Sequence, residues 1–146
     1  MSFQPRVLVS RVIPASPDDV WETIREFDTF DEWGPEPATD CHIVGDEAPT
    51  QIGAVRQFEV GDRTLQEQLV GHSDEEQFYQ YTILEGAGGK EDYLSELRLI
   101  PITDTGETLV TYEAYFDIEP SEMDDAKAHL EKVFSGALSG LHGEFA

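Results

Sequence analysis

The stretch Ser121–Leu141 constrains the fold of this chain more than any other. Its apolar residues recur at steps of three and four, which places them on one face of a helix. They are Met123, Ala126, Leu130, Val133, Phe134, Ala137, Leu138 and Leu141. Because nearly all of the preceding chain has the pattern of strands, a curved sheet must wrap this helix to bury its apolar face. We therefore expect the function to lie in the space that remains between sheet and helix.

Local signals predict where this helix begins and ends. Pro120 and Ser121 are typical of a helix start, and Asp124 has the spacing of the carboxylate in a capping box. Gly140 and Gly143 come near the end of the apolar pattern, where glycine commonly terminates a helix. The sequence therefore predicts a helix capped by Ser121 that stops at one of these two glycines.

Length and composition predict a single domain over residues 1–146 in the cytoplasm. The chain is long enough for one full core and too short for two. It has no apolar run of the roughly 18 residues that a membrane span needs, and its start lacks the pattern of a secretion signal. The one cysteine, Cys41, excludes an internal disulfide and fits a reducing compartment. We expect Cys41 to be a half-buried strand residue, since nothing marks it as a nucleophile.

The charge is extreme and argues against two classes of partner. Nine basic residues face 31 acidic ones, for a formal net charge of −22. Such a surface repels nucleic acid and anionic membranes, so we expect neither as a partner. Lysine is scarce, with only Lys90, Lys127 and Lys132. An acid-rich, lysine-poor surface is what we expect of a protein from a salt-loving organism, because salt screens the repulsion among the acids.

This charge pattern leads to a first testable prediction. We expect the melting temperature to rise by at least about 5 °C between dilute buffer and molar KCl, since a change of about 1 kcal/mol moves a domain of this size by a few degrees. The cause is screening of like charges that are closer together in the folded state. Thermal unfolding followed by circular dichroism measures the effect. The same melting temperature at both salt concentrations would contradict the salt-adaptation hypothesis.

The remaining chain alternates between strand and turn. Phe3–Ile13 is predicted to be a strand, and Ser16 with Pro17 then starts a short helix as N-cap and first helical residue. A second short helix is expected at Phe30–Trp33. Six further strands are predicted at Thr39–Val44, Gly53–Val60, Arg63–His72, Gln77–Leu84, Tyr93–Ile102 and Glu107–Ile118. The short loops between them imply antiparallel neighbours.

This order of elements, together with several motifs, resembles the START-like superfamily, also called Bet v 1-like or SRPBCC, and within it the bacterial polyketide cyclase/dehydrase branch. The motifs that carry the resemblance are Pro14-Ala-Ser-Pro-Asp-Asp-Val-Trp21, Phe27-Asp28, Trp33, Gly53-Ala-Val-Arg-Gln-Phe58, Arg63 and Glu67-Gln-Leu69. The resemblance implies an α+β helix-grip fold. In that fold a seven-stranded antiparallel sheet surrounds a long C-terminal helix, two short helices follow the first strand, and a cavity remains. Family members mostly hold apolar or amphipathic small molecules, and some cyclise polyketides.

One segment is also similar to the plant abscisic acid receptors. It runs from Tyr79 to Glu85 and continues, after a loop of similar length, at Tyr93. The gate sequence of those receptors is absent, so a hormone-receptor role does not carry over. We interpret the glycine-rich loop Gly86–Gly89 as a structural hairpin loop.

Strand alternation and the helix pattern together give the candidate ligand-binding residues. They are Arg56, Phe58, Leu65, Glu67, Tyr79, Tyr81, Ile83, Tyr93, Ser95, Tyr112, Phe116, Leu130 and Phe134. A few polar groups among apolar neighbours are typical of a ligand site. Arg56 and Glu67 fall on adjacent strands and are either a structural ion pair or ligand contacts. The tyrosines are either ordinary core residues or a flat surface for an aromatic ligand.

Three functions remain open from the sequence. The first is binding or carriage of a hydrophobic or amphipathic small molecule such as a lipid, polyketide or aromatic compound. The second is a cyclase- or dehydratase-like enzyme in which Glu67 is the acid or base and Arg56 polarises a carbonyl. The third is a partner-regulating module of the co-chaperone kind. The histidines lack metal-binding spacing and no nucleotide fingerprint is present, so we expect no metal and no cofactor, in a monomer or homodimer.

Overall fold

The computed structural model describes residues 4–35 and 37–146 of the chain. Seven antiparallel strands form one sheet in the order β1-β7-β6-β5-β4-β3-β2. The strands are β1 (Val7–Ile13), β2 (Ala38–Val44), β3 (Val55–Val60), β4 (Arg63–Ser73), β5 (Phe78–Glu85), β6 (Glu91–Pro101) and β7 (Thr108–Asp117). The helical elements are α1 (Pro17–Ile24), η1 (Phe27–Thr29), α2 (Phe30–Trp33), η2 (Pro120–Glu122) and α3 (Met123–Phe145). The predicted helix-grip fold is confirmed.

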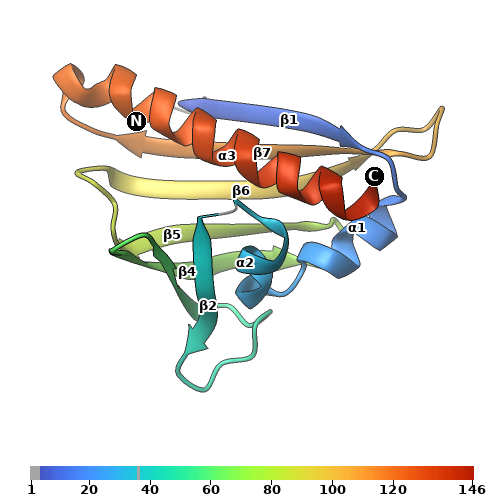
Figure 1. Ribbon diagram of the computed structural model, residues 1–146, viewed down its shortest axis with the longest axis horizontal. Coiled ribbons are helices and arrows are strands. Elements are labelled where there is room, and N and C mark those ends of the chain that lie inside the picture. Colours follow the sequence, from blue (N-terminus) through green and yellow to red (C-terminus); the bar gives the residue numbers. More distant parts are fainter. Residues whose placement is uncertain (1–3, 36) are drawn as a thin grey trace.

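The long helix α3 crosses one face of the curved sheet, and α1 and α2 close one end of the space between them (Figure 1). Its predicted apolar face is the one that is buried. The buried residues are Ala126, Leu130, Phe134, Ala137, Leu138 and Leu141, while Met123 and Val133 are half-buried against the same core. The core therefore lies between this face and the inward side of the sheet.

Helical structure begins at Pro120 as predicted, but the predicted Ser121 cap and the predicted stop at a glycine were wrong. Ser121 lies within the 3₁₀ turn η2, and the residue that precedes α3 is Glu122, whose side chain makes no capping hydrogen bond. At the other end the helix continues through Gly140 and Gly143 to Phe145. Gly140 has a packing role, because a Cβ there would lie 2.4 Å from the carbonyl oxygen of Trp33. Glycine at this position allows the helix to approach the end of α2 closely.

The start of the chain follows the prediction more closely. Phe3 lies outside the described residues, and β1 begins at Val7. The side chain of Ser16 accepts a hydrogen bond from the main-chain nitrogen of Asp19 (3.3 Å), and Pro17 is the first residue of α1. The second short helix occupies Phe30–Trp33 as expected. These local signals act within a few residues of one another, so the sequence alone was sufficient to locate them.

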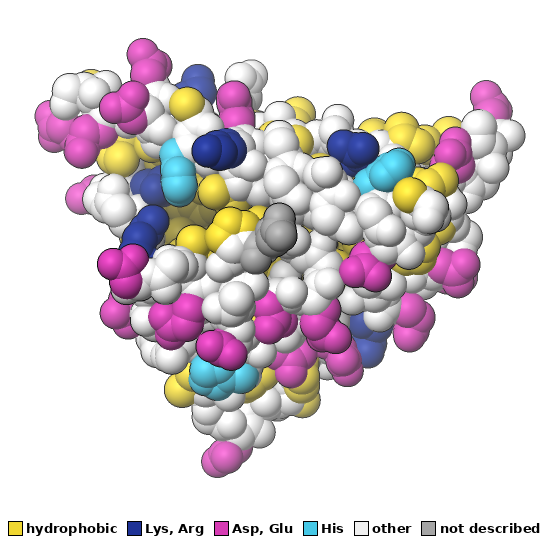
Figure 2. Space-filling model, in the orientation of Figure 1, with side chains coloured by type: hydrophobic (Ala, Val, Ile, Leu, Met, Phe, Trp, Pro, Cys, Tyr) yellow, Lys and Arg dark blue, Asp and Glu magenta, His cyan; other side chains and the backbone are white. Residues whose placement is uncertain are grey.

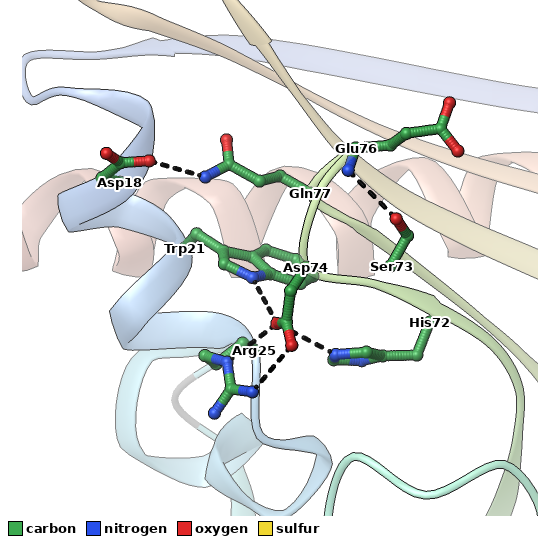
Figure 3. Close-up of polar contacts among 8 residues, drawn as sticks. All are labelled: Asp18, Trp21, Arg25, His72, Ser73, Asp74, Glu76 and Gln77. Atoms are coloured by element: carbon green, nitrogen blue, oxygen red, sulfur yellow. Dashed lines mark hydrogen bonds and ion pairs between the residues drawn. The ribbon is translucent and has the colours of Figure 1, made fainter.

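Asp74, in the turn between β4 and β5, fastens α1 to the sheet (Figure 3). Its Oδ1 accepts hydrogen bonds from Trp21 Nε1 (2.9 Å) and Arg25 Nε (3.0 Å), and lies 3.2 Å from His72 Nε2. Arg25 Nη2 donates to Oδ2 (3.1 Å). The donors from Arg25 and then Trp21 hold the pKa of the Asp74 carboxyl well below its usual range.

The hydrogen bonds to Asp74 hold α1 against the sheet, and this places aromatic rings next to the tyrosines of β5 under α3. Trp21 packs against Tyr79 with ring centroids 6.5 Å apart, and Phe27 meets the same tyrosine edge-on at 5.7 Å. Phe27 also contacts Tyr81 at 5.8 Å. The short helices thus set the position of the rings behind the sheet's central strands.

Candidate functional site

A cavity of about 130 Å³ lies between the sheet and α3 and opens to solvent. In the space-filling view a hollow with a hydrophobic floor is visible beside α3, with basic and histidine side chains at its rim (Figure 2). Its walls come from β3, β4, β5, β6, β7, the α2 region and α3. The cavity is enclosed mainly by apolar side chains.

The structure brings nine of the thirteen predicted ligand-binding residues together around this cavity. They are Phe58, Leu65, Glu67, Tyr81, Ile83, Tyr93, Tyr112, Leu130 and Phe134. The other four lie behind the lining. Tyr79 packs against Trp21 and Phe27, Phe116 stacks on Tyr93 at 6.2 Å, Ser95 donates to the Tyr93 hydroxyl, and Arg56 is enclosed among aromatic rings.

Arg56 and Glu67 form a buried ion pair between β3 and β4. Arg56 Nε and Nη2 both donate to Glu67 Oε1, at 2.9 Å and 2.6 Å, and Nη1 donates to the carbonyl of Phe27 at 3.1 Å. The guanidinium carbon lies 4.0 Å from the ring centre of Phe27 and 4.5 Å from that of Phe30. Only 1% of the Arg56 surface is exposed. The charge of Arg56 is therefore satisfied inside the protein, by a carboxylate, a carbonyl and aromatic faces.

Glu67 is the member of this pair that faces the cavity. Burial raises the pKa of its carboxyl, while the adjacent Arg56 guanidinium acts in the opposite direction. Burial disfavours the charge of Arg56, but Glu67 and then the surrounding tyrosines act in the opposite direction, and together they raise the pKa of Arg56 well above its usual value. Within the described part of the chain, no hydrogen bond reaches Glu67 Oε2. That oxygen is therefore an unused hydrogen-bond acceptor on a residue of the cavity wall.

The tyrosines of the wall are neutral and linked to one another. The Tyr81 and Tyr112 hydroxyls are hydrogen-bonded at 2.5 Å, and Ser95 Oγ donates to the Tyr93 hydroxyl at 2.6 Å. Burial raises the pKa of all three phenols. Tyr112 also stacks on Phe134 of α3, with ring centroids 3.8 Å apart. The cavity wall is thus a mostly flat aromatic surface with a few fixed polar atoms.

Sequence reasoning missed the residues at the cavity mouth. Arg63 at the start of β4, Lys90 just before β6 and His129 on α3 all border the opening. His129 is exposed on α3 and also borders the cavity.

Other candidate chemistry is not supported. Cys41 is half-buried, as predicted, and burial raises the pKa of its thiol to about 11, which disfavours the nucleophilic thiolate. Within residues 4–35 and 37–146 no three His, Cys, Asp or Glu side chains are grouped as a metal site would require. The helices found in the same ranges are also too short or too polar to cross a bilayer.

Comparison with known proteins gives one family. Residues 4–145 match the family described as "Polyketide cyclase / dehydrase and lipid transport". No curated protein matches the chain. A solved structure from Nitrosospira multiformis is 26% identical, with a TM-score of 0.84, and the match covers 96% of this chain and 95% of that one. The protein XoxI of Bacillus cereus is 24% identical (TM-score 0.83, coverage 95% and 94%) and a Thermobifida fusca protein is 23% identical (TM-score 0.86, coverage 95% and 91%). The last two show the fold alone.

Proposed function

The chain belongs to the polyketide cyclase/dehydrase and lipid transport family, with its START-like (Bet v 1-like) fold, and on this premise we propose that it binds a hydrophobic or amphipathic small molecule under α3. The observation that carries the proposal is the open cavity with a wall of aromatic and aliphatic side chains. Pockets of this kind, with a few fixed polar groups, are typical of small-molecule sites.

The energetics favour an apolar ligand with flat or extended surface. Each square ångström of apolar area that leaves water contributes about 25 cal/mol, and tyrosine and phenylalanine rings present large faces for such contact. Tyr81, Tyr93, Tyr112 and Phe134 supply these faces here. Glu67 Oε2 adds a single polar contact that would orient a hydroxyl or amide of the ligand.

Filling the cavity tests the proposal. We expect Ile83→Trp to weaken uptake of a neutral fluorescent probe such as Nile red at least about tenfold, because Ile83 borders the cavity and the indole would occupy it. The neighbouring Leu84 on β5 is 52% exposed, so Leu84→Trp is the matched control and should bind as the parent chain does. Probe fluorescence and native mass spectrometry report the binding. Parent protein that takes up none of a panel of apolar probes would refute the proposal.

A second candidate function is acid–base chemistry by Glu67. The observation in its favour is a carboxyl group at the cavity wall whose pKa is raised by burial. Arg56 lies behind this carboxyl, and each of its three nitrogens already donates a hydrogen bond inside the protein. Arg56 would therefore act as a positioning residue for Glu67 and not as the group that polarises a substrate carbonyl.

Turnover of a poly-β-keto substrate separates this enzyme from a pure binding protein. We expect Glu67→Gln to remove any turnover while the variant still takes up Nile red, because the amide keeps the shape of the side chain but cannot exchange a proton at neutral pH. Turnover that persists in Glu67→Gln would eliminate Glu67 as the acid or base.

A further inference from the structure

We propose that the ligand carries an anionic oxygen group, a carboxylate or a phosphate, which lies at the cavity mouth between Arg63, Lys90 and His129. This inference rests on the proposed binding function and names the chemical class of the ligand. Three separate segments supply the three side chains: Arg63 is the first residue of β4, Lys90 lies in the loop just before β6, and His129 lies on α3. The same three residues border both the cavity and the more open hollow outside it.

The accumulation of positive charge at this opening is unusual for this chain. Only nine of 146 residues are Lys or Arg, against 31 acids. Two of the nine border one opening, and a histidine lies beside them. Burial and then the nearby charge of Arg63 lower the pKa of Lys90. The pKa of His129 is also lowered, by burial and then by Lys90 and Arg63.

These cations have no carboxylate partner in the described part of the protein. Ion pairs there involve Arg6, Arg25, Arg56, Arg98 and His72. Arg63 Nη2 instead lies 3.5 Å from the carbonyl of Gly86, and Lys90 Nζ donates to the carbonyl of Ala87 at 3.0 Å. Glu122 and Asp125 border the outer hollow, but neither lies within the 4.0 Å of an ion pair. Arg63 and Lys90 therefore each have donors free for an anion from solution.

The cavity changes in polarity along its depth. Glu67 is the one acidic residue of its lining within the described residues, and Arg56 balances that charge. The interior is therefore apolar and close to neutral, and the opening is cationic. A molecule with a hydrophobic body and one anionic end matches this gradient, with the body under α3 and the anion at the mouth.

Three ligands with the same alkyl chain test the inference: decanoate, decyl phosphate and decanol. We expect at least one of the two anions to displace Nile red at about tenfold lower concentration than decanol in moderate KCl. A tenfold difference in affinity is in the range that hydrogen bonds to charged groups contribute. The double variant Arg63→Gln/Lys90→Gln should lose this advantage and keep its affinity for decanol. The variant Arg11→Gln/Lys127→Gln removes the same charge from residues outside the cavity lining and should retain the advantage.

The outcomes distinguish this inference from the proposed function. If all three ligands bind the parent protein equally, or if the mouth variant keeps the preference, the anion inference is overturned while the binding function stands. If none of the three binds, the binding function itself fails. A preference for decyl phosphate over decanoate supports the inference and indicates a lipid headgroup, and the reverse indicates a free acid. If the double variant does not fold, the KCl dependence of ligand binding by the parent protein tests the inference instead. The affinity for the anions should fall as KCl rises, while the affinity for decanol should be independent of KCl.

Discussion

Removing either member of the buried ion pair alone, as Arg56→Met or Glu67→Leu, is expected to lower the free energy of unfolding by about 3–5 kcal/mol. The double variant Arg56→Met/Glu67→Leu is expected to remain within about 1 kcal/mol of the parent chain. The two single changes are therefore far from additive. Urea unfolding at one fixed KCl concentration measures all four proteins, and urea is preferred because guanidinium chloride would itself screen charge.

The physical reason is the cost of a lone buried charge. Arg56 is 1% exposed and Glu67 is 5% exposed, so neither can recover water as a partner when the other is removed. In Glu67→Leu the guanidinium keeps only the Phe27 carbonyl and the surrounding rings. In the double variant two apolar side chains of similar size meet, and the desolvation cost of both ions disappears.

The outcome also bears on function. If the pair is only structural, the apolar double variant should bind probes as well as the parent protein, or better. If Glu67 Oε2 contacts the ligand, the double variant should be stable and yet bind hydroxyl-bearing ligands more weakly. Single variants that each lose less than about 1 kcal/mol, with additive effects, would show that the pair is hydrated, contrary to its geometry here.

Patterns with a fixed period were sufficient to predict the faces of the elements. Leu130 and Phe134 on α3, and Glu67 and Leu69 on β4, are buried as their spacing indicates, since the helix and strand periods leave little freedom. The period of a sequence pattern identifies the buried face of a strand but not which residues of that face border the cavity. Tyr79 and Tyr81 share one face of β5, yet only Tyr81 borders the cavity, because the short helices cover the part of the sheet around Tyr79.

The mouth could not be predicted because it is assembled from distant segments. Arg63, Lys90 and His129 each occupy an unremarkable local position beside a turn, a loop or a helix flank, and only the tertiary fold brings them to one opening. The prediction of the end of α3 failed for a related reason. Gly140 has the sequence signature of a helix stop, but glycine is required at this position because α3 there lies very close to the end of α2. That contact joins residues about a hundred positions apart in the chain.

That contact leads to the last prediction, for Gly140→Ala. An alanine Cβ at position 140 would lie 2.4 Å from the carbonyl oxygen of Trp33 and 2.7 Å from that of Gly34. Both atoms belong to the main chain, so no side chain can rotate away, and α3 or the end of α2 must move. We expect a loss of roughly 1–3 kcal/mol in the free energy of unfolding, the usual cost of overpacking, although alanine is intrinsically the better helix former by about 1 kcal/mol.

Gly136→Ala is the matched control, because it makes the same change one turn earlier on the same helix. The nearest atom to a Cβ there is Pro35 Cβ at 4.0 Å, so the control should gain about 0.5–1 kcal/mol from helix propensity alone. Since Phe30 of α2 borders the cavity, a shift of α2 in Gly140→Ala should also weaken Nile red binding, while Gly136→Ala should not. Equal stabilisation of both variants would mean that α3 and α2 are not in the close contact from which the cavity geometry follows.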